Sequence, residues 1–291
     1  MFVTIHMARD HRSRLVEALS GASGLPVMSA RNHGAIRKRC VYVATPDRHL
    51  LLADGETRLG VGPRENLARP AVDPMMRSAA LAYGPRVVGI ILTGRLWDGA
   101  AGLAAIKAMG GLALVQSPDE AQAPDMPLAA LQAVTPDAVL SVPDLASLLV
   151  ALVASEAGPA PPRSATLSYE VDIALGLRRS AADLARVARA TPLTCPDCGG
   201  VLSEMHGSPL RLRCQVGHAM SAGELADRMA EQDEAMRIAL RIIEGRLELM
   251  RRMAADARAS GRPRTAEIYR ARGEEYDRHV EVLRKALEAP L

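Results

Sequence analysis

Short apolar stretches alternate with longer stretches of helical periodicity through the first half of the chain. Several of the apolar stretches are unbroken and rich in Val and Ile, which is typical of strands buried on both faces of a parallel sheet. They cover residues 2–5, 40–44, 49–53, 87–92, 113–116 and 138–142. Stretches with helical spacing or capping residues lie between them, at residues 9–19, 71–82, 101–109, 126–132 and 144–154. This alternation predicts an α/β fold for residues 1–155.

The alternation stops at residues 158–162, where the sequence Gly-Pro-Ala-Pro-Pro has no apolar periodicity. Because such a run favours a semi-rigid linker, we place a domain boundary here and expect residues 156–190 to form a linker and a helix. Three of the four cysteines then follow within residues 191–220, which we treat as a small segment of its own.

The last segment, residues 221–291, carries apolar residues at steps of mostly three and four, over residues 225–254 and again over residues 269–287. Gly261 and Pro263 separate the two stripes, which is typical of a helix stop followed by a new start. The pattern predicts an α-helical hairpin with one buried face. Its 14 basic and 14 acidic residues indicate a solvated outer face and not a basic nucleic-acid-binding helix.

Composition and charge exclude several classes of function. The chain has five Tyr, one Trp and one Phe, which are too few aromatic side chains for the stacking platforms of a typical single-strand nucleic-acid binder. A net charge of +3 from 36 basic and 33 acidic residues is a weak field, so no polyanionic partner is expected. The longest apolar run, residues 145–154, is too short for a membrane span, and the N-terminus does not resemble a signal peptide. We therefore expect a cytoplasmic protein without membrane insertion.

The most specific local signal is a set of metal-ligand residues. Cys195 and Cys198 lie on a Gly-closed turn, and Cys214 and His218 form a second pair after fifteen intervening residues. Three thiolates and an imidazole are the tetrahedral donor set of a structural Zn²⁺ site, which leaves no position for a reacting water. Residues 191–220 are therefore predicted to be a Cys₃His zinc ribbon that the metal stabilises. A group of buried cysteines without metal is the alternative.

Two further polar residues follow predicted strands. Asp98 comes after the apolar stretch 87–92 and before a helix-like segment, where the carboxyl end of a parallel strand often places functional side chains. His6 directly follows the first predicted strand. Both positions have ordinary alternatives, since Asp is a common helix cap and a lone His is more often structural. The pattern alone leaves these alternatives open.

Seven short fragments mark residues 1–150. They are His6-Met7, Leu25-Pro-Val27, Val41-Tyr-Val43 with Pro46-Asp-Arg-His49, Arg69-Pro-Ala-Val-Asp73 with Ser78, Val88-Gly-Ile-Ile-Leu-Thr-Gly94, Asp98-Gly-Ala-Ala-Gly102 and Met126-Pro127. In this order they resemble the catalytic domain of CheB-type protein-glutamate methylesterases, and the resemblance implies a doubly wound, mostly parallel sheet. The cysteine-rich segment and the helical hairpin resemble the C-terminal extension of a subset of CheB-like proteins.

The resemblance implies a hydrolase of chemotaxis signal transduction. Its members are Ser-His-Asp esterases that remove methyl groups from glutamate methyl esters on methyl-accepting chemotaxis receptors and deamidate some receptor glutamines, with no cofactor for catalysis. His6 matches the family's general base, and Asp98 matches the acid that orients this base. Met7, Thr93 and Gly94 match positions that line the pocket. In such a triad the imidazole takes the serine proton, while the carboxylate fixes the ring tautomer and stabilises the imidazolium.

Two departures from the family pattern concern the active site. The family's nucleophile lies on a Gly-x-Ser-x-Gly-Gly turn ahead of the histidine, whereas this chain begins five residues before His6, so we regard the nucleophile as absent. Ser23 lies in an imitation of that motif, but it follows a helix-like stretch and is not expected to act as the nucleophile. The second departure is Arg95-Leu96-Trp97, where the family usually has Met-Gly and a small or polar residue. This segment is expected to block or reshape the pocket.

Two explanations fit the missing serine: a start codon assigned too far downstream, or a degenerate relative without catalysis. The leading hypothesis is a methylesterase whose zinc-ribbon and hairpin extension serves docking or self-association. Because the sequence shows no receiver domain, regulation would come from a phosphorelay-associated partner or from the extension. The alternative is a non-catalytic scaffold in a chemosensory signalling cluster. A nucleic-acid regulator is a third reading that rests on the ribbon alone.

Overall fold

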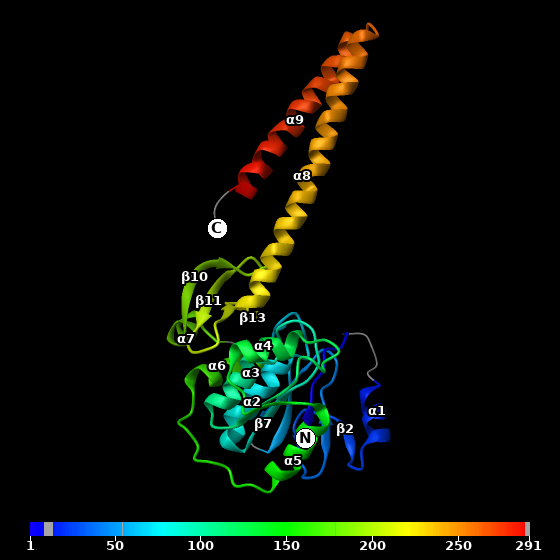
Figure 1. The fold of residues 1–291 in the computed structure, drawn as a ribbon. Helices are drawn as coiled ribbons and strands as arrows, with labels where there is room; N and C mark the ends of the chain where they lie inside the picture. Colours follow the sequence, from blue (N-terminus) through cyan, green and yellow to red (C-terminus); the bar gives the residue numbers. More distant parts are fainter. Residues whose placement is uncertain (9–13, 54, 178, 289–291) are drawn as a thin grey trace. The chain divides into compact units, whose positions relative to one another are not determined.

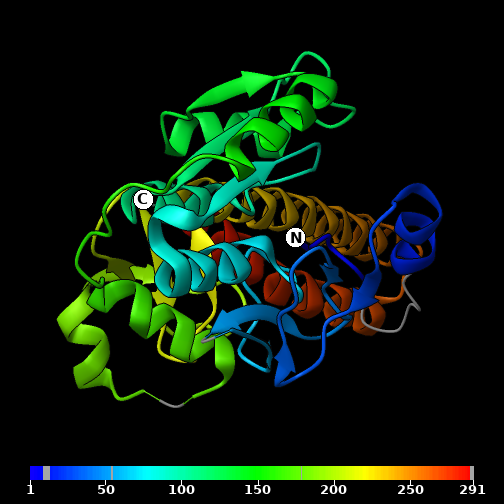
Figure 2. The same ribbon diagram turned by 90° about the horizontal axis from the view of Figure 1, so that it is seen from below.

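The computed structural model describes residues 1–8, 14–53, 55–177 and 179–288, and it divides into two compact units, Met1–Leu225 and Ala226–Leu291 (Figure 1). Part of the helix predicted for residues 9–19 lies outside the described residues. Within the described chain a helix begins later, as α1 (Leu15–Ala22). It lies beside the edge strand β2, on the side of the first unit away from strands β10–β13 (Figures 1 and 2).

Two small parallel sheets form the strand layer of the first unit. In one, β4 (Val41–Val43) lies between β1 (Phe2–Val3) and β2 (Val27–Ser29). In the other, β8 (Leu112–Gln116) lies between β7 (Val88–Ile91) and β9 (Ala138–Leu140). Helices connect these parallel strands, so the predicted α/β class is confirmed for this part of the chain.

The strand predicted at residues 49–53 belongs to an antiparallel sheet. β5 (His49–Ala53) pairs antiparallel with β6 (Glu56–Gly60), and β3 (Gly34–Ala35) extends this sheet. Two residues separate β5 from β6, which is enough for a hairpin and far too few for a parallel crossover. The sequence signal for the hairpin is the Asp-Gly pair at residues 54–55.

Helix α2 is the central helix of the first unit. The helices that follow the predicted stretches are α2 (Val72–Tyr83), the short η1 (Gly84–Arg86), α3 (Ala100–Ala108), α4 (Asp125–Ala133) and α5 (Val142–Val153). α2 packs against α3 and β5, and every residue from position 72 to position 80 is buried. Its Met76 side chain belongs to a core shared with Leu50, Leu103 and Ile106. A helix buried on all sides positions the groups at its N-terminus firmly.

Residues after the proline-rich stretch also pack into the first unit. They form α6 (Ala165–Leu175), α7 (Ala181–Val187) and an antiparallel sheet of β10 (Ala188–Thr194), β11 (Val201–Met205), β12 (Arg211–Cys214) and β13 (Ala219–Ser221). α6 packs against α2, β5 and β6. We call β10–β13 the C-terminal sheet.

The second unit consists of helical residues. Helix α8 (Ala222–Ala259) begins at the end of the first unit and continues into the second, and α9 (Pro263–Glu288) follows after a turn in which Gly261 has a φ of +69°. The two helices run side by side in both views (Figures 1 and 2). Gly273 of α9 faces Met250 and Leu247 of α8, and Arg251 pairs with Asp277 across the two helices. No helix among the described residues combines the length and the apolar character needed to cross a membrane.

Candidate functional site

The fold brings His6 and Asp98 together from sequence positions 92 residues apart. His6 follows β1, and Asp98 lies in the loop between β7 and α3. The Nε2 atom of His6 is 2.7 Å from the Oδ2 atom of Asp98. The Asp98 side chain is fully buried, whereas the His6 side chain is 35% exposed. The pair therefore has a fixed buried end and an end that is open to solvent.

Backbone N–H groups hold the Asp98 carboxylate. Val72 N donates to Oδ2 at 2.6 Å, Asp73 N donates to Oδ1 at 3.1 Å, and Gly99 N donates to Oδ1 at 2.9 Å. Val72 and Asp73 are the first residues of α2, so Asp98 accepts from the otherwise unpaired N–H groups of that helix. The ordinary alternative, a cap of its own helix α3, is wrong, because the N-cap of α3 is Gly99 without a side-chain hydrogen bond.

The electrostatics of the pair follow from these contacts. Burial by itself would raise the Asp98 pKa, but the hydrogen bond and charge of His6, with the Val72 and Asp73 N–H groups, outweigh it and hold this pKa below its ordinary value. The hydrogen bond to Asp98 raises the pKa of His6, against the opposing effect of partial burial. An imidazole that a charged carboxylate supports in this way is a stronger base than a free histidine.

Asn66 and Asp73 complete the surroundings of Asp98. The Nδ2 atom of Asn66 donates to Asp98 Oδ1 at 3.1 Å and to Asp73 Oδ2 at 2.9 Å, so one amide bridges two buried carboxyl groups. Gly102 N of α3 donates to Asp73 Oδ1 at 2.6 Å. Burial and the charge of Asp98 raise the pKa of Asp73 to about 7. The sequence analysis gave neither residue a role, although Asp73 lies in one of the seven fragments.

A cleft of about 350 Å³ opens beside His6. The cleft is lined by residues after β1, by the β4–β5 loop, by the loop before α2 and by the β7–α3 loop: His6, Met7, Ala8, Asp47, Arg64, Asn66, Leu67, Ala68, Arg69 and Leu96. Arg69 is tied to Asp47 by hydrogen bonds of 3.0 and 2.6 Å, whereas Arg64 is exposed. Asn66, Leu67 and Leu96 have φ values of 46°, 64° and 67°. Such backbone is uncommon outside glycine and clusters at functional sites.

The predicted pocket residues fall into two groups. Met7 lines the cleft, as expected. Thr93 and Gly94 are not among its lining residues: Thr93 Oγ1 accepts from Ala123 N at 2.8 Å, and Gly94 N donates to Ala123 O at 2.9 Å. Both residues fasten the β7–α3 loop to the segment before α4.

The unusual segment 95–97 divides between the cleft and the packing of the fold. Leu96 lines the cleft, whereas the Trp97 ring covers Gly223 at the start of α8, where a Cβ atom on the glycine would lie only 2.5 Å from Trp97 Cε2. Trp97 is not among the residues that line the cleft. The tryptophan is therefore explained by a contact with α8 that the sequence pattern did not indicate.

Within the described part of the chain, no serine hydroxyl forms a hydrogen bond to the His6 ring. The Ser23 Oγ atom accepts from Leu25 N at 3.0 Å, beyond the end of α1. This is an ordinary local turn contact and not the contact of a nucleophile with its base.

The Cys195, Cys198, Cys214 and His218 side chains gather at the end of the C-terminal sheet, with their ligand atoms within 4.8 Å of one another. We call them the Cys₃His cluster. The Sγ atoms of Cys198 and Cys214 are 3.7 Å apart, and His218 Nδ1 is 3.6 Å from Cys214 Sγ and 3.8 Å from Cys195 Sγ. A tetrahedral zinc with Zn–S bonds of about 2.3 Å and a Zn–N bond of about 2.1 Å has edges of about 3.6–3.8 Å, so the donors fit this ion.

In a comparison with known protein families, residues 1–149 match the family model for the CheB methylesterase domain. A protein-glutamate methylesterase/protein-glutamine glutaminase of Paramagnetospirillum magneticum is 39% identical over 156 residues, which are 52% of this chain and 41% of the relative. A relative from Leptospira interrogans, named for the same two activities, is 38% identical over 140 residues, which are 48% of this chain and 71% of the relative.

Among solved structures, the CheB methylesterase catalytic domain of Thermotoga maritima matches 52% of this chain and 82% of its own, with 28% identity and a TM-score of 0.49. The match to the Paramagnetospirillum relative covers less than half of that protein's length. The part of this chain that matches the family model contains both His6 and Asp98. On the family model and the Leptospira relative, the chain belongs to the CheB methylesterase family.

Proposed function

We propose that residues 1–155 form a protein-glutamate methylesterase and protein-glutamine deamidase domain, with His6 as the general base and Asp98 as its orienting acid. The observation that carries the proposal is the hydrogen bond between His6 and a fully buried Asp98, beside a cleft, in a chain of this family. The names of the relatives suggest a glutamate methyl ester on a protein as the substrate class. The family resemblance implies that this substrate protein is a methyl-accepting chemotaxis receptor.

The geometry supports the following roles. Asp98 holds one ring nitrogen of His6, which leaves the other ring nitrogen to take a proton from the family's serine hydroxyl and later to return it to the departing methanol. No described residue supplies that serine at the His6 ring, so His6 and Asp98 are the two members of the triad that this chain contributes. The charge on Asp98 stabilises the imidazolium that forms between these steps. The helix α2 N–H groups keep this carboxylate ionised without water. Met7 lines the cleft that receives the ester, and Thr93 and Gly94 act indirectly, through the position of the β7–α3 loop.

The test is hydrolysis of a methylated receptor by the protein isolated from the cells that naturally produce it, measured as released methanol. We expect turnover, and we expect His6→Ala, introduced at the native gene, to lower it by about 10²–10⁴-fold because the general base is lost. His33→Ala is the matched control, since His33 is exposed and pairs with Glu56 away from the cleft. Absence of turnover in the unaltered protein, or equal turnover in the His6 variant, would contradict the proposal.

We also propose that the Cys₃His cluster binds a structural Zn²⁺, which makes the C-terminal sheet a zinc ribbon. Support comes from the donor set and from ligand distances that match a tetrahedral ion. Four protein ligands leave no open position, so the metal would stabilise the fold and take no part in ester hydrolysis.

Metal analysis of the purified chain tests this second proposal. We expect about one zinc ion per chain, and a marked loss of zinc in Cys198→Ser. Cys40→Ser is the matched control because Cys40 lies next to β4, outside the cluster. Zinc-free protein from zinc-sufficient cells, or equal zinc in the Cys198 variant, would refute the site.

A further inference from the structure

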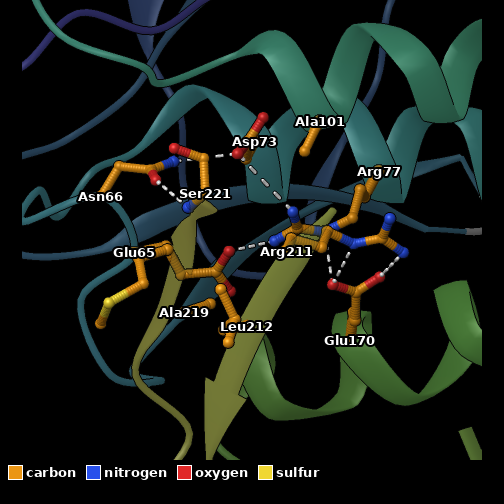
Figure 3. Close-up of a pocket in the computed structure, with 11 residues that line it drawn as sticks. Glu65, Asn66, Asp73, Arg77, Ala101, Glu170, Arg211, Leu212, Ala219 and Ser221 are labelled. Atoms are coloured by element: carbon orange, nitrogen blue, oxygen red, sulfur yellow. Dashed lines mark hydrogen bonds and ion pairs between the residues drawn. The ribbon is translucent and has the colours of Figure 1, made fainter. Parts of the chain in front are cut away.

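The C-terminal sheet and the His6–Asp98 pair are joined by a continuous series of contacts inside the first unit. Figure 3 shows the pocket at which β12 and β13 meet α2 and the segment Glu65-Asn66. Two routes cross this junction, one through a buried ion pair and one through backbone hydrogen bonds. A third contact reaches the loop that carries Asp98.

The first route begins inside the Cys₃His cluster. Arg213 precedes the cluster residue Cys214, and its Nη1 atom donates to the carbonyl of Gly217 at 2.8 Å, next to His218. The Nη2 atom of the same guanidinium donates to Glu65 Oε1 at 2.9 Å. Both Arg213 and Glu65 are almost completely buried. The loop between two cluster residues is thus tied to the residue that directly precedes Asn66.

The second route runs from β13 to Asn66. Asn66 N donates to Ala219 O at 3.0 Å, and Ser221 N donates to the Asn66 side-chain oxygen at 3.3 Å. These bonds orient the amide so that its Nδ2 atom reaches Asp98 and Asp73. In Figure 3, dashed lines join Asn66 to Ser221 and to Asp73. Only one side chain therefore separates the C-terminal sheet from the carboxylate that holds His6.

The third contact is the Trp97 ring on Gly223, two residues after β13. Trp97 directly precedes Asp98 in the chain, so this contact restrains the same carboxylate from the backbone side. Asp98 is thus restrained through Asn66 and through Trp97. Both of these residues are held in turn by residues after position 210, Ser221 and Gly223.

We propose that the C-terminal sheet is a positioning element of the His6–Asp98 pair, so that metal binding at the Cys₃His cluster sets whether Asp98 holds the His6 ring. The inference rests on the proposed zinc site and the proposed esterase, and Asn66 is its positioning residue. It adds a role to the docking or self-association expected of the extension.

The physical reason is that a small metal-stabilised sheet has two states. A sheet with a core as small as that of β10–β13 loses its order when its metal is removed, because metal binding supplies most of its folding free energy. Release of β12 would take Arg211 and Arg213 away from Glu170 and Glu65. Glu65 would keep only Arg77 of α2 as a cation. Because a buried carboxylate that loses one of its two cations is less well compensated, the Glu65-Asn66 segment would rearrange as well.

The test measures the pKa of the His6 ring by NMR in the zinc-loaded full chain, with His6→Gln to assign the signal. In Asn66→Ala we expect this pKa to fall toward the ordinary value of about 6.5 while zinc content stays unchanged, because Asp98 loses the one side-chain donor that orients it toward the ring. Asn32→Ala is the matched control: the Asn32 side-chain oxygen also accepts a backbone N–H, from Leu59 at 3.0 Å, at an exposed site remote from the pair. Removal of zinc from the unaltered chain should produce the same fall, and zinc added back should reverse it.

The opposite results are equally definite. If Asn66→Ala leaves the His6 pKa unchanged, Asn66 does not position the pair, and the proposal fails. If the His6 pKa rises, Asp98 has kept its contact with His6 and has only become more basic through the loss of a donor, and the proposal fails as well. If zinc removal leaves the pKa unchanged, the metal is not coupled to the site. Should zinc removal also unfold the core, seen as lost Leu103 and Val115 methyl signals, the Asn66 variant alone decides. None of these readouts uses turnover, so they stand apart from the test of the esterase.

Discussion

At the scale of single residues, Asp98 keeps its charge in a fully buried place because its surroundings replace water. The first turn of α2 supplies two N–H donors, Asn66 supplies an amide donor, and His6 supplies a positive partner when protonated. Asp73 is also buried, and its pKa is raised because burial and the charge of Asp98 outweigh the effect of the nearby Arg77. Two neighbouring carboxyl groups in different environments therefore take different protonation states, which suits one charged orienting group.

Asp98→Asn should separate the role of this charge from the role of its shape. The amide offers His6 no negative charge, so we expect the His6 pKa to fall and turnover by the esterase to drop on the order of 10⁴-fold. His6 acts only when neutral, and its raised pKa places the loss of activity on acidification above pH 6.5 in the unaltered protein. A pH–rate profile checks this. Asp256→Asn, at an exposed pair with Arg262 in the second unit, is the control and should leave the acidic limb unmoved.

Gly223→Ala tests the contact between Trp97 and α8. The added Cβ would meet the indole at about 2.5 Å, so ring or backbone must shift, and we expect a loss of about 1–3 kcal/mol in the free energy of unfolding of the first unit. Gly245→Ala in the same helix meets nothing within 4 Å and should stabilise its helix by about 0.5–1 kcal/mol. Trp97 is the single tryptophan, so its fluorescence in a urea titration reports on the first unit. Equal stability of the Gly223 variant and the unaltered chain would contradict the packing described.

At the scale of elements, local patterns predicted what local forces determine. The helix expected at residues 71–82 is α2 (Val72–Tyr83), because apolar spacing starts and stops it within its own sequence. The strand at residues 49–53 was predicted, but its antiparallel pairing was not, because a hydrophobic run does not report its partner strand. The positions of Asn66 and Arg213 were equally hidden, since their partners lie 32 and 148 residues away in Asp98 and Glu65. The resemblance stated from the sequence therefore pointed to His6 and Asp98, but not to Asn66 or Arg213, which hold their surroundings in place.

The buried ion pairs between α2, α6 and β12 should make the first unit sensitive to acid. Burial alone would raise the pKa of Glu65, but Arg213 and Arg77 outweigh it and lower the pKa to about 2 from 4.5. A carboxyl group whose pKa is lower in the folded chain than in the unfolded chain stabilises the fold. This stabilisation is complete at a pH above the pKa of the unfolded chain and is lost as the pH falls toward the pKa of the folded chain. Here that contribution is about 3 kcal/mol, lost between about pH 4.5 and pH 2.

Glu65→Gln should therefore be destabilising at pH 7, by about 3–5 kcal/mol because two buried arginines lose a partner, and should show a flatter decline on acidification. Urea titrations followed by Trp97 fluorescence between pH 7 and pH 3 measure both effects. Glu204→Gln, at an exposed pair with Arg189, is the control and should change stability by less than about 1 kcal/mol. A Glu65 variant with the pH dependence of the unaltered chain would show that this carboxylate is not the acid-sensitive group.

At the scale of the whole molecule, the two units are held by different forces. Packing of α2 and buried ion pairs stabilise the first unit, and its C-terminal sheet carries the Cys₃His cluster. The second unit is a helix pair with Leu247, Ala254 and Val280 buried and its ion pairs exposed, and none of its described residues belongs to the Cys₃His cluster. Exposed pairs of this kind contribute little, so the apolar seam provides most of its stability.

Metal removal should therefore act on one unit and spare the other. With a chelator, we expect Trp97 fluorescence to change, because its contact with Gly223 follows directly on β13, whereas the helical circular dichroism of α8 and α9 should largely persist. Added zinc should restore the fluorescence, and a Cys40→Ser chain should respond as the unaltered one does. If the helical signal collapsed together with the Trp97 signal, the second unit would depend on the metal as well. The helix pair would then need the folded C-terminal sheet as its anchor, and its apolar seam would be insufficient alone.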